Sequence, residues 1–135
     1  MSNITQVVNT DKNMKTLKKG MHASDMDQLL SSSGPFTFFA PSDIAFEKLE
    51  KGYMEDLVES KNKSALTELI KSHLVSGKIF FKELKDGDKL QTVNGKELLV
   101  QVKGINVSIG DIAVQARDAK ITNGVIHSLD TVLAN

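Results

Sequence analysis

The sequence contains no cysteine, no tryptophan and only one tyrosine, and neither sign of charge predominates. Without cysteine the chain can form no disulfide, no zinc–thiolate or iron–sulfur centre and no thiol nucleophile. Seventeen Lys and Arg residues balance seventeen Asp and Glu residues, so the chain lacks the basic surplus with which dedicated nucleic-acid binders neutralise phosphates. Composition therefore excludes several kinds of chemistry and assigns none.

Long apolar runs are missing as well. No stretch approaches the ~20 apolar residues of a membrane-spanning helix, so we expect no membrane-spanning segment. The N-terminal segment MSNITQVVNTDKNMKTLKKG lacks the apolar core of a secretory signal, which leaves either a cytoplasmic protein or an exported one whose signal has been removed. The length of 135 residues predicts a single domain over residues 1–135.

Apolar residues recur at helical spacing through most of residues 1–75. Asn3 is the expected N-cap of the first helix. Gly20 is expected to interrupt the second helix, and Ser24 is expected to cap the third. The first part of the chain is therefore predicted to be a set of short helices.

A run of strand formers at residues 36–40 separates these helices from the next group. A helix should follow it, with Ser42 as its expected N-cap, and end at Gly52. The longest helix is expected to begin at Asn62 or Ser64 and to end at Gly77.

Residues 78–135 change to the alternation that is typical of half-buried strands. Asn94-Gly95 is expected to form a two-residue hairpin turn, because both residue types tolerate positive φ. Asn123-Gly124 is a further expected turn. Helices first and strands later predict an α+β domain. The strands with the clearest alternation are expected at residues 98–102, 105–109 and 112–116.

Standard catalytic and ligand-binding motifs are absent from the sequence. Asp86-Gly87-Asp88 could begin a calcium loop, but the rest of the ligand pattern is missing, so we expect a turn there. The three histidines, His22, His73 and His127, could together bind zinc. Because His73 and His127 lie among apolar residues, we interpret them as buried side chains that bond a neighbour, and we expect no metal and no cofactor.

Three segments of the chain carry its most distinctive patterns. They are GPFTFFAPSDIAFEKL at residues 34–49, LTELIKSHLVSGKI at residues 66–79 and NGVIHSLDTVL at residues 123–133. The first and last resemble the two signature blocks of fasciclin-like domains, and the middle one resembles the family's tyrosine-histidine segment. The resemblance extends from Ile4 to Leu133 and fits a single, free-standing, bacterial member of the family.

This resemblance implies an α+β fold: a wedge-like β-sandwich of about seven strands with several mainly N-terminal helices. His127, Asp130 and Asp43 are then expected to form one hydrogen-bonded polar cluster with a structural role, because buried polar groups need partners. The residues expected to carry the structural motif are Phe38, Ala40, Pro41, Ser42, Asp43, Phe46, Asn123, Gly124, His127 and Asp130.

The resemblance also implies a non-catalytic adhesion or protein-interaction module that is secreted, periplasmic or at the cell surface. In animal members, integrin binding is associated with the tyrosine-histidine segment and with an Asp-Ile pair before the second block. This chain has Ser72 in place of the tyrosine and keeps His73. It has Asp118, followed by Ala119 in place of the isoleucine. These positions are candidate interaction residues for an extracellular or cell-surface protein, a polysaccharide or another copy of the chain.

Other functions remain open at this point. A few algal relatives bind carotenoids, so the chain could carry a small apolar ligand beside Met26, Met54 or phenylalanine side chains, although such residues more often form ordinary core. An enzyme is the third hypothesis and the least favoured, so we expect no enzymatic activity. Its acid/base pair would come from Asp43, His73, His127 and Asp130.

Overall fold

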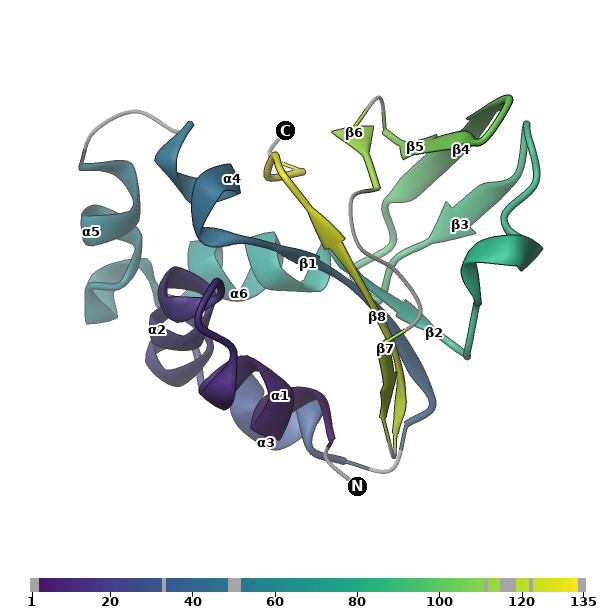
Figure 1. Ribbon diagram of the computed structural model, residues 1–135. Coiled ribbons are helices and arrows are strands. Elements are labelled where there is room, and N and C mark those ends of the chain that lie inside the picture. The colour runs from purple at the N-terminus through teal and green to yellow at the C-terminus, as the bar shows by residue number, and fades with distance from the viewer. Residues whose placement is uncertain are drawn as a thin grey trace.

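The computed structural model describes residues 3–32, 34–48, 52–110, 112–114, 119–121 and 123–133. These residues form three layers (Figure 1). A first sheet lies in the middle, helices cover one of its faces, and a second sheet packs on the other. The expected α+β class, with a β-sandwich and mainly N-terminal helices, is confirmed.

Each layer is built from short elements. The helical layer contains α1 (Ile4–Thr10), α2 (Lys15–Ala23), α3 (Met26–Leu30), α4 (Asp43–Glu47), α5 (Tyr53–Leu57), the 3-10 turn η1 (Ser60–Asn62) and α6 (Lys63–Lys71). The first sheet has the order β2-β1-β8-β7, formed by β2 (Leu74–Ser76), β1 (Phe36–Pro41), β8 (Gly124–Leu129) and β7 (Ala119–Ile121). A second 3-10 turn, η2 (Phe81–Glu83), precedes the other sheet. That sheet has the order β3-β4-β5-β6, formed by β3 (Lys89–Gln91), β4 (Glu97–Lys103), β5 (Asn106–Ile109) and β6 (Ile112–Ala113).

The start of α1 confirms the expected N-cap. The Asn3 side chain accepts a hydrogen bond from the Gln6 main-chain N–H at 2.9 Å, and the Gln6 side chain accepts one from the Asn3 N–H at 2.9 Å. This reciprocal capping box satisfies two donors that a helix start leaves unpaired.

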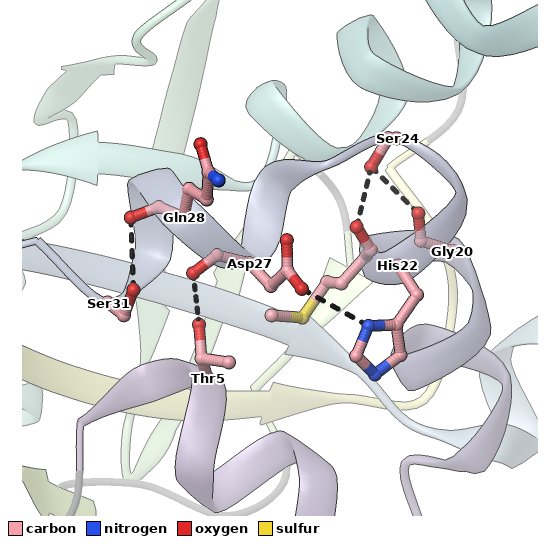
Figure 2. Close-up of polar contacts among 8 residues, drawn as sticks. Thr5, Gly20, His22, Ser24, Asp27, Gln28 and Ser31 are labelled. Atoms are coloured by element: carbon pink, nitrogen blue, oxygen red, sulfur yellow. Dashed lines mark hydrogen bonds and ion pairs between the residues drawn. The ribbon is translucent and has the colours of Figure 1, made fainter.

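The expected break at Gly20 and the expected cap at Ser24 are both wrong. Helix α2 continues through Gly20, which is buried and faces Leu66 and Ile70 of α6. Ser24 ends α2: its hydroxyl donates to the main-chain carbonyls of Gly20, at 2.7 Å, and Met21, at 3.3 Å (Figure 2). A glycine inside a helix that faces another helix cannot be distinguished in the sequence from a helix break. In the same way, a serine that bonds the preceding helical turn cannot be distinguished from the N-cap of the next helix.

The longest helix also ends earlier than expected. Helix α6 stops at Lys71, and Leu74–Ser76 form β2 instead of a further helical turn. In β2, Leu74 pairs with Phe38 of β1 and Val75 pairs with Thr37. The apolar spacing of these residues also fits a helix, but they form a strand because they pair with the edge of β1 that β8 does not occupy.

Strand β1 is buried on both faces. Phe38 and Ala40 point into the core beneath the helices, whereas Phe39 points into the core between the two sheets. Strand β1 pairs with β8 in parallel, from Phe36 with Gly124 to Pro41 with Leu129. The two sequence blocks that are far apart in the chain thus form one central strand pair (Figure 1).

The second sheet alternates largely as expected. Leu98 and Val100 of β4 and Val107 and Ile109 of β5 are buried against the first sheet. Ile105 is the exception: it lies in the turn between Lys103 and Asn106 and is 89% exposed. Residue 105 therefore belongs to a hairpin turn and not to a strand.

The Asn94-Gly95 turn has a different geometry from the expected two-residue turn. Thr92 donates from its N–H to the Lys96 carbonyl at 2.8 Å, so the loop has an additional residue, and the positive φ falls at Gly95. Glycine at this position fits a three-residue hairpin.

Two isolated bridges join the two sheets into a sandwich. Val75 of β2 bridges to Thr92, and Leu129 of β8 bridges to Val114. The core between the sheets is closed at these two corners.

Within the described part of the chain, no helix is long and apolar enough to cross a membrane.

Candidate functional site

The aromatic residues of the first signature block form the centre of the fold. Phe38 and Ala40 have no exposed surface, and Phe46 of α4 is buried against them. Pro41 ends β1, where it pairs with Leu129. These residues are therefore part of the core, next to the polar residues that follow in the chain.

Ser42 lies at the N-cap position of α4, but its hydroxyl does not cap that helix. It donates to the Leu129 carbonyl at 3.1 Å and so joins the end of β1 to the end of β8. The next residue, Asp43, accepts a hydrogen bond from the Thr16 N–H at 2.9 Å. The expectation that Ser42 caps the helix is wrong: its hydroxyl is directed to a carbonyl across the sheet and accepts no hydrogen bond from the first turn of α4.

Asn123 joins three segments. Its side-chain oxygen accepts from the Ile4 N–H at 3.1 Å, and its side-chain nitrogen donates to the carbonyls of Leu30, at 2.8 Å, and Ser32, at 2.7 Å. Its own carbonyl accepts from the Phe36 N–H at 2.8 Å. The side chain thus pairs main-chain groups at the start of α1 and at the end of α3, a role that has no signal in the sequence.

Gly124 is constrained by space. A Cβ atom at this position would lie 1.8 Å from the Phe36 carbonyl oxygen. Only glycine allows β8 to approach the start of β1 this closely.

His127 is fully buried between the two sheets. Its Nε2 lies 2.8 Å from the Ile79 carbonyl oxygen, which can only accept, so Nε2 carries the proton. The ring stacks on Phe39, with 5.4 Å between the ring centres. The interpretation of His127 as a buried, hydrogen-bonded histidine agrees with this geometry.

The expected polar cluster of His127, Asp130 and Asp43 is not formed. Asp130 is half-buried and accepts from Thr131 at 3.3 Å, with the Lys48 Nζ at 3.6 Å. Asp43 bonds the start of α2 and His127 bonds the Ile79 carbonyl. Asp43 and His127 thus bond main-chain groups, whereas Asp130 contacts the side chains of Thr131 and Lys48.

His73 is almost completely buried at the corner between α6 and β2. Its Nδ1 lies 2.8 Å from the Leu69 carbonyl oxygen, and its Nε2 accepts from the Leu133 N–H at 2.9 Å. The carbonyl requires a proton on Nδ1 and the N–H requires a free lone pair on Nε2, so the ring is held neutral.

The environment of His73 opposes protonation. Burial, the largest cause, lowers the pKa of His73 from its ordinary 6.5 to about 4. The hydrogen bond to Leu69 acts in the raising direction, and the positive charge of Lys96 adds to the lowering. Because His73 is buried and bonded at both ring nitrogens, no reacting group can reach it. Its role is to stabilise the fold.

Ser72 is also buried, and its hydroxyl turns back into α6. It donates to the carbonyls of Glu68, at 2.8 Å, and Leu69, at 2.9 Å.

Beside Ser72 lies a pocket of about 100 Å³. Its other lining residues are Lys96, Glu97, Leu98, Gly110, Ile112, Val132 and Leu133. Periodicity gave no sign of this pocket, because the residues that line it come from four separate parts of the chain.

The other candidate interaction residues lie elsewhere. Ala119 begins β7, where its backbone pairs with Ile126. Asp118 lies outside the described residues. The structure therefore brings Ser72 and His73 together at one corner and places Ala119 on a different edge of the first sheet.

The acidic turn and the remaining histidine have structural partners. The Asp86 carboxylate accepts from the Val102 N–H at 2.9 Å, and the Asp88 carboxylate accepts from the Lys85 N–H at 3.2 Å. His22 pairs with Asp27 at 3.1 Å on the helical surface (Figure 2). Among the described residues, no group of three or more His, Cys, Asp or Glu side chains converges on a metal position.

An apolar cavity lies between α2, α4, α6 and β1. It is lined by residues including Leu17, Phe38, Phe46 and Leu66, and its volume is about 10 Å³. That is about the space of one water molecule. Met26 is part of the helical core, and the side chain of Met54 lies outside the described residues.

Sequence comparisons agree on one family. The model of the fasciclin domain matches residues 12–135. Protein sll1483 of Synechocystis sp. is 34% identical over 130 residues, which cover 96% of this chain and 72% of that protein. Protein sll1735 of the same organism is 31% identical over 134 residues, 98% of each chain. The transforming growth factor-beta-induced protein ig-h3 of Sus scrofa is 30% identical over 133 residues, which are 98% of this chain and 19% of that protein.

The fold has a solved counterpart. It is similar to a FAS1 domain pair from the insect cell adhesion molecule fasciclin I, with a TM-score of 0.88 and 21% sequence identity. The similarity covers 99% of this chain and 51% of that chain, so this chain spans about half of the pair.

Proposed function

This chain belongs to the fasciclin domain family, and on that basis we propose that it is a non-catalytic adhesion or protein-interaction module acting outside the cell or at its surface. The observation that carries the proposal is the family match over residues 12–135. The solved structure of similar fold comes from a protein described as a cell adhesion molecule. The partner is an extracellular or cell-surface protein or polysaccharide.

The geometry of the polar residues supports a role without catalysis. General acid–base catalysis needs a side chain within hydrogen-bond reach of a reacting group. His73 and His127 are buried and bond main-chain groups, and Asp43 bonds the Thr16 N–H. These side chains are thus committed to holding segments of the chain together.

A carrier for a small apolar ligand is the second candidate, and the cavity volume weighs against it. Ligand pockets for drug-sized molecules occupy roughly 300–1,000 Å³. The apolar cavity beneath the helices has about 10 Å³, so a carotenoid or lipid would require the core to open. Absorbance and native mass spectra of protein purified from its source test this candidate, and a bound pigment or lipid would support it.

Surface binding tests the adhesion proposal. The purified chain is immobilised and exposed to envelope proteins and polysaccharides from its source organism. We expect saturable binding of at least one component that soluble chain competes away, and an acid-unfolded sample should not bind. Turnover of a substrate by the folded chain, without any such binding, would contradict the proposal.

A further inference from the structure

The pocket beside Ser72 is lined by both apolar and charged residues. Leu98 and Leu133 are each 7% exposed and Ser72 is 2% exposed. Lys96 and Glu97, which are exposed, are also among its lining residues. The pocket therefore combines buried leucine side chains with one charge of each sign.

From this arrangement we propose that the pocket beside Ser72 binds a single aromatic side chain, a tyrosine or phenylalanine, from a partner protein. The proposal rests on the adhesion function proposed above and specifies where the partner anchors. Aromatic side chains are the usual anchors of protein interfaces because one ring buries a large area at low entropic cost.

The volume selects the occupant. An apolar cavity of about 150 Å³ encloses benzene completely, so a pocket of about 100 Å³ that opens to the surface holds one ring with part of the ring left at its mouth. It is too small for a lipid chain or a carotenoid. Because Lys96 and Glu97 offset each other's charge, the pocket has no excess charge to select a phosphate or a carboxylate.

The walls of the pocket are held in place without its occupant. Ser72 is fixed by its bonds to the Glu68 and Leu69 carbonyls. Leu133, another lining residue, is fixed by the bond from its N–H to His73. Because the walls are already ordered, binding of the partner loses no conformational entropy in ordering them.

The test uses p-cresol, the side-chain analogue of tyrosine, titrated into the isotopically labelled full chain and followed by NMR. We expect saturable shifts at Leu98, Ile112 and Leu133, with a dissociation constant on the order of 1 mM for so small a ligand. Ser72→Tyr should place its own ring in the pocket and weaken p-cresol binding at least tenfold. The matched control is Ser64→Tyr, which adds the same ring on the exposed face of α6 and should bind like the wild type.

If Ser72→Tyr does not fold, Ser72→Leu fills the same space with an aliphatic side chain and should give the same loss. Shifts scattered over the surface, or Ser72 variants that fold and bind p-cresol like the wild type, would overturn the proposal. Sedimentation of the wild type and of Tyr53→Ser tests whether the ring comes from a second copy of this chain. A wild-type dimer that is lost in Tyr53→Ser would overturn the assignment to a partner protein. Loss of surface adhesion with p-cresol binding intact counts against the adhesion function and leaves the pocket assignment standing.

Discussion

The imidazole of His73 holds the main chain of Leu133: Nε2 accepts from the Leu133 N–H at 2.9 Å, across 60 residues of sequence. The other ring nitrogen bonds the Leu69 carbonyl at 2.8 Å. One neutral ring therefore connects the end of α6 to the end of the second signature block. It also supports one wall of the pocket beside Ser72.

Replacing His73 should destabilise the fold strongly. His73→Ala leaves the Leu133 N–H without its acceptor and opens a cavity, and we expect a loss of about 3 kcal/mol in the free energy of unfolding. Urea unfolding followed by circular dichroism measures this loss. His22→Ala, on the helical surface, is the control and should change the free energy by less than about 0.5 kcal/mol. Equal stability of both variants would show that the Leu133 bond contributes little.

Stability should fall as the pH is lowered from about 6.5 to about 4, because the pKa of His73 lies near 4 in the folded chain and near 6.5 when it is unfolded. Between these values the unfolded chain binds the additional proton, so protons favour unfolding. The contribution of His73 is complete above the higher value, and on the order of 3 kcal/mol of it is lost by the lower one.

Unfolding curves at several pH values test this dependence. Other groups also titrate in the acid range, so the measurement compares the wild type with His73→Gln, which keeps a polar side chain but cannot take up the proton. The difference between the two proteins should shrink as the pH falls. Parallel pH profiles would mean that His73 does not carry the effect.

Gly124→Ala should prevent normal folding. The added Cβ would lie 1.8 Å from the Phe36 carbonyl oxygen, so β8 could not keep its register with β1. We expect loss of the cooperative unfolding transition. Gly95→Ala is the control: its φ is positive, but nothing lies within 4 Å of the added Cβ, and its cost should be about 1 kcal/mol. A cooperative Gly124→Ala variant as stable as Gly95→Ala would disprove this packing.

Asn123→Ala should cost about 2–4 kcal/mol, because three main-chain groups lose their partners at once. Asn123→Asp distinguishes the contribution of the side-chain acceptor from that of the side-chain donor. It keeps the oxygen that bonds the Ile4 N–H but loses the nitrogen that bonds two carbonyls. We expect Asn123→Asp to be destabilised as well. Thermal unfolding measures both, and Asn106→Ala, which alters an exposed residue, should leave the melting temperature nearly unchanged.

Several local features could be predicted from the sequence, because they depend on neighbours in the chain. The Asn3 cap and the strand at Phe36–Ala40 are examples, and both are present in the structure. The alternation at Leu98 and Val100 also matches their burial. In each case the determining contacts lie within a few residues of one another.

Features set by distant contacts could not be predicted in this way. The end of α6 is decided by the open edge of β1, which accepts Leu74 as a strand residue. Ser42 bonds β8 and not its own helix because Leu129 lies beside it only in the folded chain. The burial of His73 and His127 was expected, but their main-chain partners, Leu133 and Ile79, have no signal in the sequence.

The measurement that tests the proposed adhesion function most directly is the retention of beads coated with the folded chain on cells of its source organism under flow. We predict that coated beads stay attached more often than uncoated beads and that soluble chain added in excess releases them. Beads coated with the unfolded Gly124→Ala variant should behave like uncoated beads. Equal retention of folded-chain and uncoated beads on every cell surface tested would contradict the proposed function.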